Sequence, residues 1–241
     1  MDAARRNNSS RATFKHEDLD NPFASGGFRW VAKGVYTRGQ RKGEACVCKW
    51  FKSGSVFSRA FFSEDIKAVA KAIEIVQDWN DEGLVNKTVQ VNEAEVWTFL
   101  ETGEQCLVEP FIKNYQKFNS NSGWCDRSTP WPRVMQALSH YSYYLSDGEL
   151  LLCDLQGGCY RNGIVLTDPV IMSRGRHFGV TDLGAKGIAN FFAKHKCNEY
   201  CRSYWAKPSN ARSHFRAVPG TTMRPNNVPT RHSRGLMTLQ E

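Results

Sequence analysis

A cluster of metal-binding residue types late in the chain constrains the fold most. It reads His195-Lys196-Cys197-Asn198-Glu199-Tyr200-Cys201 and brings one imidazole and two thiols close together. Cys197 and Cys201 would share one face of a continuous helix and His195 would not, so we expect a bend near Lys196. Zinc accepts Cys and His ligands, and four protein ligands make a closed, structural site.

The fourth ligand must come from elsewhere in the chain, and His140 is the best candidate. It lies in Ala137-Leu138-Ser139-His140-Tyr141-Ser142-Tyr143, shortly before the strongest apolar run. The alternative is that both cysteines are core thiols and that His195 is a surface residue, because cysteine is often buried.

The composition is that of a globular protein. The chain has 241 residues, 41% of them apolar, which suits one large domain or two lobes that share a cleft. Its eight cysteines stand singly or in the close pairs Cys46/Cys48 and Cys197/Cys201. No signal peptide and no apolar run of membrane-spanning length is recognisable, so we expect a reducing, cytoplasmic setting and no membrane partner.

The net charge of +8 favours anionic partners such as nucleotide phosphates. Much of the excess lies in the final segment, where Glu241 is the single acid and the bases are Lys207, Arg212, Arg216, Arg224, Arg231 and Arg234. The body of the chain mixes both signs, which argues against nucleic acid as a partner.

The pattern of apolar residues predicts an α+β protein with two lobes. Residues 1–20 are expected to form an N-terminal arm, and residues 206–241 a basic, flexible tail. Short strands are predicted at 28–36, 45–51, 89–91, 95–99, 105–111 and 149–154. Helices are predicted at 59–79, from the spacing of Ile66, Val69, Ala70, Ile73 and Val76, at 132–144, and over most of 187–204. The junction between a strand-rich lobe with one long helix and a more helical lobe would fall near residues 109–113.

A glycine pair and a lysine on neighbouring strands could bind phosphate. Gly26 and Gly27 precede Arg29, and Lys49 lies between the apolar pairs Val47-Cys48 and Trp50-Phe51. Glycine lets backbone N–H groups approach phosphate oxygens, which a lysine can neutralise. A Gly-Gly hairpin turn with an ordinary edge lysine is the alternative.

Three oxygen-bearing side chains follow the last predicted strand. Asp154 ends it, Gln156 comes two residues later, and Asp168 lies beyond a loop. Such hard ligands can hold Mg²⁺ against phosphates, and either carboxylate could accept a hydroxyl proton. The two aspartates could instead be turn or cap residues. The Gly179–Gly184 loop could bind an anion or pass close to a substrate, although a plain helix start is the default interpretation.

Taken in order, these segments resemble the alpha-kinases, a family of atypical protein kinases. The landmarks are Pro22-Phe23-Ala24 with Gly26-Gly27-Phe28-Arg29, Leu107-Val108-Glu109-Pro110-Phe111-Ile112, Lys117-Phe118-Asn119-Ser120-Asn121-Ser122-Gly123, Asp154-Leu155-Gln156-Gly157, Leu166-Thr167-Asp168-Pro169, the Gly179–Gly184 loop and the His195/Cys197/Cys201 cluster. The resemblance covers residues 22–205, and the His-Arg-Asp and Asp-Phe-Gly motifs of conventional protein kinases are absent.

The resemblance implies a two-lobed kinase domain over residues 21–205, with an N-lobe at 21–110 and a C-lobe at 111–205. Within it, Lys49 would contact the ATP phosphates, together with the segment Gly26, Gly27 and Arg29, and Glu109 and Phe111 would offer backbone hydrogen bonds to adenine. Asp154 would be the catalytic carboxylate and Gln156 and Asp168 would bind Mg²⁺.

The resemblance also implies roles for the Gly179–Gly184 loop and for the Cys/His cluster. The loop from Gly179 to Gly184 would help to place a protein substrate, phosphorylated on Ser or, preferentially, Thr. His140, His195, Cys197 and Cys201 would hold structural zinc.

Two features depart from the family pattern or leave a choice open. The segment Gly158–Ile164 is longer than the pattern and could displace the magnesium ligands, which would leave a catalytically inactive binding or scaffold module as the main alternative function. Glu64 is the preferred ion-pair partner of Lys49 over Glu74, although an acid near a helix start is commonly solvated.

Overall fold

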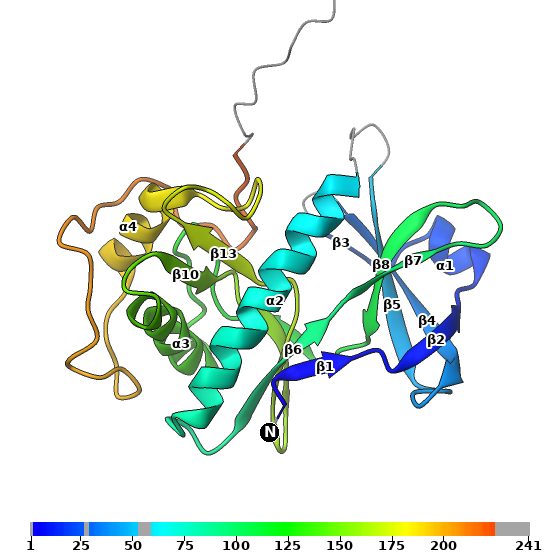
Figure 1. The fold of residues 1–241 in the computed structure, drawn as a ribbon, viewed down its shortest axis with the longest axis horizontal. Helices are drawn as coiled ribbons and strands as arrows, with labels where there is room; N and C mark the ends of the chain where they lie inside the picture. Colours follow the sequence, from blue (N-terminus) through cyan, green and yellow to red (C-terminus); the bar gives the residue numbers. More distant parts are fainter. Residues whose placement is uncertain (1, 27–28, 53–58, 225–241) are drawn as a thin grey trace, which may run out of the picture.

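The computed structural model describes residues 2–26, 29–52 and 59–224 (Figure 1). Its elements are β1 (Ala4–Arg6), β2 (Ser9–Thr13), α1 (His16–Asp20), β3 (Ala24–Ser25), β4 (Arg29–Gly39), β5 (Ala45–Phe51), α2 (Arg59–Asp81), β6 (Thr88–Glu93), β7 (Glu95–Thr98), β8 (Gln105–Pro110), β9 (Tyr115–Lys117), α3 (Trp131–Leu145), β10 (Leu150–Cys153), β11 (Gln156–Tyr160), β12 (Gly163–Leu166), β13 (Val170–Ser173) and α4 (Gly184–Lys194). The strands predicted between residues 28 and 154 and the helices predicted at 59–79 and 132–144 are present, with bounds shifted by a few residues.

The first sheet has six strands and forms one side of the molecule (Figure 1, right). Its order is β2-β4-β5-β8-β7, and β3 pairs with β4. The central strand β5 pairs with β4 and β8, so that Lys49 stands opposite both Val31 and Leu107. One face of this sheet buries Ala32, Tyr36, Cys46, Cys48, Cys106 and Val108. Pairing on both sides holds Lys49 inside the sheet and away from its edges.

The second sheet joins segments that are far apart in the sequence. Its five strands have the order β1-β6-β12-β11-β9, and β6 runs parallel to β12 with Val91 opposite Leu166. Helix α2 packs against β6, β13 and α3 (Figure 1). The expected division at residue 110 is therefore not followed, because β1, α2 and β6 pack with the later half of the chain.

Helix α2 is amphipathic, but its buried stripe is rotated from the predicted one. Val69 and Val76 are buried as expected, whereas Ile66 is 42% exposed. The stripe consists of Phe62, Ala68, Val69, Ala72, Ile75, Val76 and Trp79. Trp79 is fully buried and packs edge-on against Tyr141 of α3, with ring centroids 5.5 Å apart. The largest side chain sets the orientation because it removes the most apolar area from water.

Residues 2–20 form ordered structure, which differs from the N-terminal arm expected there. Ala3 is fully buried, and the Asn7 side-chain amide donates to the Val108 carbonyl over 2.9 Å. Strands β1 and β2 extend the two sheets at their edges. Edge strands can satisfy their backbone hydrogen bonds without an apolar pattern, which is why composition misled here.

The chain changes direction after α4, and the helix predicted to continue to Tyr204 is wrong. Helix α4 ends at Lys194, and His195 has extended backbone angles, so the predicted bend is present one residue earlier. Residues 206–224 contain no helix or strand. They are nevertheless docked on the domain, because Arg212 N donates to Ala189 O and Arg224 N to Val180 O. Among the described helices, none is long and apolar enough to cross a membrane.

Candidate active site and metal cluster

A buried lysine between two carboxylates forms the centre of the site. Lys49 is 5% exposed. Its Nζ lies 2.9 Å from Glu109 Oε1 on the neighbouring strand and 2.7 Å from Asp168 Oδ2. It also donates to Thr167 Oγ1 over 3.0 Å, and the Thr167 hydroxyl is within hydrogen-bond distance of both Glu109 carboxylate oxygens. Lys49 is therefore not the ordinary edge lysine of the alternative interpretation, and its contact with ATP phosphates stays a prediction.

Lys49 and the carboxylates beside it stabilise one another's charged forms. Burial by itself would lower the pKa of Lys49, but Asp168 and Glu109 raise that pKa above its ordinary value. Burial likewise opposes ionisation of Asp168, yet Lys49 and Arg29 hold the pKa of this carboxyl below its ordinary value. Lys49 and Asp168 are therefore both charged at neutral pH.

The predicted partner of Lys49 is wrong. Glu64 lies beside Gly179, where an added Cβ would come 2.4 Å from its Oε2, and Glu74 pairs with Lys71 on the helix surface. Glu109 takes the role of partner because β8 is hydrogen-bonded to β5. The pairing depends on strand order, which the local sequence around α2 does not contain.

Asp154 forms a second, separate charged centre at the end of β10. Its side chain is 1% exposed and its Oδ2 lies 3.0 Å from Lys117 Nζ. Asn121 N donates to Oδ1 over 3.1 Å, and the Thr221 hydroxyl donates to Oδ2 over 2.6 Å. Asp154 and Asp168 both have positive φ, 58° and 47°. Non-glycine residues in this conformation cluster at functional sites.

The long segment between Gln156 and Asp168 does not move these two residues apart. Residues 157–166 form a hairpin in which Gly157 pairs with Leu166 and Tyr160 with Gly163. Thr167 N donates to Gln156 O over 3.0 Å, and the Gln156 amide donates to Asp168 O over 3.3 Å. The extra residues extend the hairpin, so they do not separate Gln156 from Asp168. The catalytically inactive module stays an alternative to the active kinase.

The first glycine segment lies beside an ion pair to α2. Gly26 N donates to Arg29 O over 2.9 Å, whereas Gly27 falls outside the described residues. Arg29 pairs with Asp65. Burial raises the pKa of Asp65 to about 6, and Arg29 partly offsets this rise.

The second glycine segment is organised by Asp182. This buried carboxylate accepts hydrogen bonds from the backbone N–H groups of Ser173, Phe178 and Gly184. Gly179 and Gly184 have φ values of 80° and 70°, which favour glycine. The loop is therefore held in shape from within, ahead of α4.

The main chain of Phe111 already has partners. Its N–H donates to Ala45 O over 3.0 Å, and its carbonyl accepts from the Arg5 guanidinium over 3.4 Å. The expected hydrogen bond from this N–H to adenine therefore does not fit this structure. The Glu109 carboxylate contacts Lys49 and Thr167, and the expected backbone hydrogen bond from Glu109 to adenine stays a prediction.

The four predicted metal ligands do come together. One atom each from His140, His195, Cys197 and Cys201 lies within 4.8 Å of the others. Cys197 Sγ lies 3.5 Å from His140 Nδ1 and 3.7 Å from His195 Nε2, and Cys201 Sγ lies 3.8 Å from His195 Nε2. His140 Nε2 is 3.1 Å from Ala206 O, the outer contact that fixes a ligating imidazole. Burial lowers the pKa of both histidines, which favours the neutral form that binds metal.

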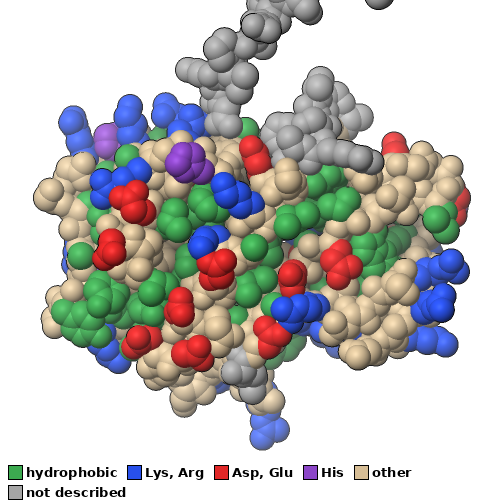
Figure 2. Space-filling model, viewed as in Figure 1, with side chains coloured by type: hydrophobic (Ala, Val, Ile, Leu, Met, Phe, Trp, Pro, Cys, Tyr) green, Lys and Arg blue, Asp and Glu red, His purple; other side chains and the backbone are tan. Residues whose placement is uncertain are grey.

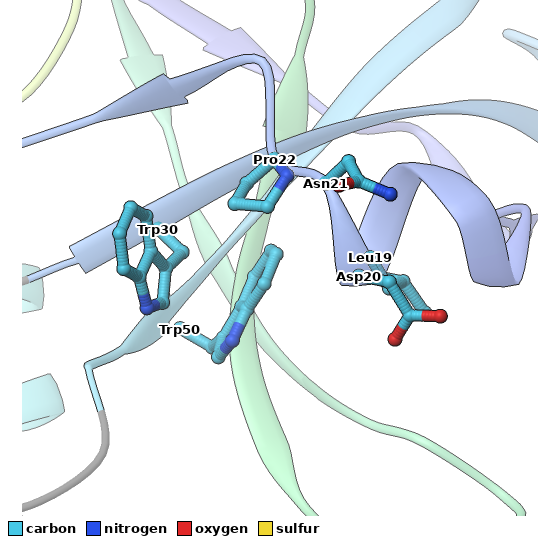
Figure 3. A pocket seen from close by; sticks show the side chains of 6 residues that line it. All are labelled: Leu19, Asp20, Asn21, Pro22, Trp30 and Trp50. Carbon is cyan, nitrogen blue, oxygen red and sulfur yellow. The ribbon is translucent and has the colours of Figure 1, made fainter.

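Other surface features do not compete with this site. A pocket beside α1 is lined by Leu19, Asp20, Asn21, Pro22, Trp30 and Trp50 (Figure 3). Because successive side chains of a strand point to opposite faces, Trp50 and this pocket lie on the face away from Lys49. The face drawn in Figure 2 intersperses acidic with basic side chains and carries no continuous basic surface.

Sequence reasoning missed four residues of the two charged centres. Lys117, Asn121 and Thr167 belong to recognised segments but had no assigned role, and Thr221 was not considered. The sequence carried one signal for Asn121, the unbroken polar run of residues 119–122, which the structure buries almost completely. Buried polar groups need partners, and these side chains find them within the domain and in residues 218–222.

Comparisons with solved structures define the fold. The structure of an alpha kinase from Entamoeba histolytica matches with a TM-score of 0.70 and 24% identity, covering 84% of this chain and 82% of that one. The inactive alpha-kinase domain of myosin-II heavy chain kinase A complexed with ATP matches with a TM-score of 0.67 and 22% identity, covering 79% and 87%. The protein therefore has the mixed α/β fold of alpha-kinase domains.

Sequence comparisons define the family. The alpha-kinase family model matches residues 24–201. Alpha-protein kinase 1 of Dictyostelium discoideum is 33% identical over 219 residues, which is 86% of this chain and 15% of that protein. This chain belongs to the alpha-kinase family. It spans 30% or less of the length of such curated relatives.

Proposed function

We propose that the protein is a serine/threonine kinase that transfers the γ-phosphate of ATP to protein substrates, with a preference for threonine. The observation that carries the proposal is the Lys49 ammonium, held by Asp168 at 2.7 Å and Glu109 at 2.9 Å where the two sheets meet. A buried, fixed cation next to a carboxylate suits binding of nucleotide phosphates. Phosphoryl transfer is catalysed mainly by positioning and charge neutralisation.

The two aspartates take different roles in this proposal. Asp168 already pairs with Lys49, so it suits a place beside the phosphates, where with Gln156 it would hold Mg²⁺. The metal would neutralise the charge of the phosphates when bound. Asp154 accepts a hydroxyl hydrogen bond at 2.6 Å, which suits acceptance of the substrate proton. Lys117 at 3.0 Å keeps that carboxylate oriented.

The remaining predicted residues would act around this centre. Gly26 lies between β3 and β4 and Arg29 begins β4, and both would cover the nucleotide. The loop from Gly179 to Gly184, which the Asp182 carboxylate holds in shape, would help to place the protein substrate.

The Cys/His cluster supports a structural zinc. A tetrahedral ion with Zn–N of about 2.0 Å and Zn–S of about 2.3 Å separates its ligands by roughly 3.3–3.8 Å, which the measured distances of 3.5 to 3.8 Å fit. His140 comes from α3 and the other three ligands follow α4. The ion would therefore fasten the segment after α4 to α3, as expected for a zinc-stabilised C-terminal lobe.

A transfer assay tests the kinase proposal. Purified protein with Mg-ATP should phosphorylate a threonine-containing peptide, and Lys49→Ala and Asp154→Ala should each reduce kcat at least about a hundredfold. Lys42→Ala is the matched control, because this lysine lies exposed in the turn between β4 and β5. Undiminished transfer by both site variants would refute the assignment of the site.

A further inference from the structure

The segment after the Cys/His cluster returns to the proposed active site. Residues 212–224 follow the surface of the α4 side of the domain without forming a helix or strand. Asn190, fully buried in α4, accepts hydrogen bonds from the backbone N–H groups of His214 and Phe215 at 2.9 Å each. This anchor directs the following residues toward Asp154.

The next part of the segment is held almost entirely through its main chain. Ser122 Oγ contacts both Val218 N, at 3.0 Å, and Val218 O, at 3.1 Å. Asn121 accepts from Thr222 N over 2.9 Å and donates to Thr222 O over 2.7 Å. Arg224 N donates to Val180 O over 2.8 Å. Asn121 and Ser122 are themselves fully buried, so buried polar side chains hold the main chain of this segment at Val218 and Thr222.

The clamp on Thr222 sets the register of the segment. The residue before it, Thr221, donates its hydroxyl to Asp154 Oδ2 over 2.6 Å, and Lys117 Nζ reaches the same hydroxyl over 3.4 Å. Asn121 N meanwhile contacts Asp154 Oδ1. Asn121 thus holds both the main chain of Thr222 and the Asp154 carboxylate, which accepts the hydrogen bond from the Thr221 hydroxyl.

We infer that the groove lined by Lys117, Asn121, Ser122 and Val180 is the binding site for the substrate peptide, and that residues 218–224 fill it in cis as a substrate would, with Thr221 at the acceptor position. The inference rests on the proposed function of Asp154. With Thr221 in place, both Asp154 oxygens are hydrogen-bonded and the side chain is 1% exposed, so a second hydroxyl cannot reach it. The segment therefore competes with substrates in trans.

The same contacts indicate which peptides the proposed substrate site would bind. Main-chain recognition at three residues tolerates many side chains, whereas the acceptor must be a hydroxyl at the position before the Asn121 clamp. Transfer would break the bond from the γ-phosphorus to its bridging oxygen and form one to the threonine Oγ. The hydroxyl proton would pass to Asp154 and ADP would leave. ATP, already the substrate in the proposed function, is the one co-reactant required.

Kinetics of the full chain test the competition. Thr221→Val removes the hydroxyl that meets Asp154, and we expect it to lower KM for a threonine peptide about tenfold, the factor for one charge-assisted hydrogen bond, with kcat changed less than twofold. The matched control is Thr98→Val on the edge strand β7, whose side chain is exposed, and it should keep the parent KM. An unchanged KM in Thr221→Val would overturn the inference.

A labelled peptide provides a readout independent of catalysis. A fluorescent peptide with the sequence of residues 216–224 should bind Thr221→Val about tenfold more tightly than the parent chain, and Asn121→Ala added to that variant should abolish binding. The active enzyme should phosphorylate this peptide on the first of its two threonines. Phosphate on the second alone would refute the register. If the peptide binds as expected but no form transfers phosphate, the kinase proposal fails and the groove stands; if transfer occurs but the peptide does not bind, the inference fails alone.

Discussion

Replacing Glu109 by Gln tests how the buried charges around Lys49 are balanced. The carboxylate is 3% exposed and accepts from both Lys49, over 2.9 Å, and the Thr167 hydroxyl, over 2.7 Å. Glutamine keeps one acceptor oxygen but turns an amide NH₂ toward these donors, so about one charge-assisted hydrogen bond is lost. Such a bond contributes roughly 1.5–3 kcal/mol. We therefore expect the free energy of unfolding to fall by about 2 kcal/mol.

Urea unfolding at pH 7 measures this change, and Glu104→Gln in the exposed turn before β8 is the matched control. A surface substitution of that kind should stay within about 0.5 kcal/mol of the parent. Lys49 would keep Asp168 as its partner, so the variant should still fold. If Glu109→Gln were as stable as the control, Asp168 alone would balance the buried lysine and the paired-carboxylate description would be incorrect.

Two further predictions concern the metal cluster and the ion pair at α2. Purified protein should contain about one zinc per chain, and a chelator or Cys197→Ser should lower the midpoint of thermal unfolding. Cys159→Ser, outside the cluster, is the control and should keep the metal. Metal-free protein with an unchanged midpoint would exclude a structural role for zinc. Asp65 has a pKa raised from 3.8 to about 6, so the folded chain holds a proton that the unfolded chain has released. Stability should therefore fall as pH rises from about 4 to about 6, and urea titrations should show a flatter profile for Asp65→Asn; identical slopes in both proteins would contradict the assignment.

Local pattern is sufficient to predict several parts of the molecule. The strand at 45–51, the helices near 59–79 and 132–144, and the four members of the Cys/His cluster can all be identified from the amino-acid sequence. These features depend on side-chain periodicity and on ligand chemistry, which neighbouring residues carry with them. The family landmarks are equally recognisable, because their order along the chain is itself information.

Other features depend on how distant segments pair. Lys49 meets Glu109 and Asp168, and not Glu64, because β5 is hydrogen-bonded to β8 and because the β11–β12 hairpin returns Thr167 and Asp168 to Gln156. Neither contact has a local signature. The same holds for β6, which is close in sequence to the six-stranded sheet but pairs with β12.

Composition was least informative where polar segments became ordered. Residues 2–20 and 206–224 look mobile by composition, yet both find backbone partners on the domain: β1 and β2 at sheet edges, and residues 212–224 on Asn121, Ser122 and Asn190. A hydrogen bond to the main chain requires no particular side chain on the segment that is bound. The amino-acid sequence thus determined which chemical groups are available, and the tertiary structure decided which of them meet. The reason is that charge pairing and main-chain hydrogen bonding act over a few ångströms, between residues that can be a hundred positions apart in the sequence.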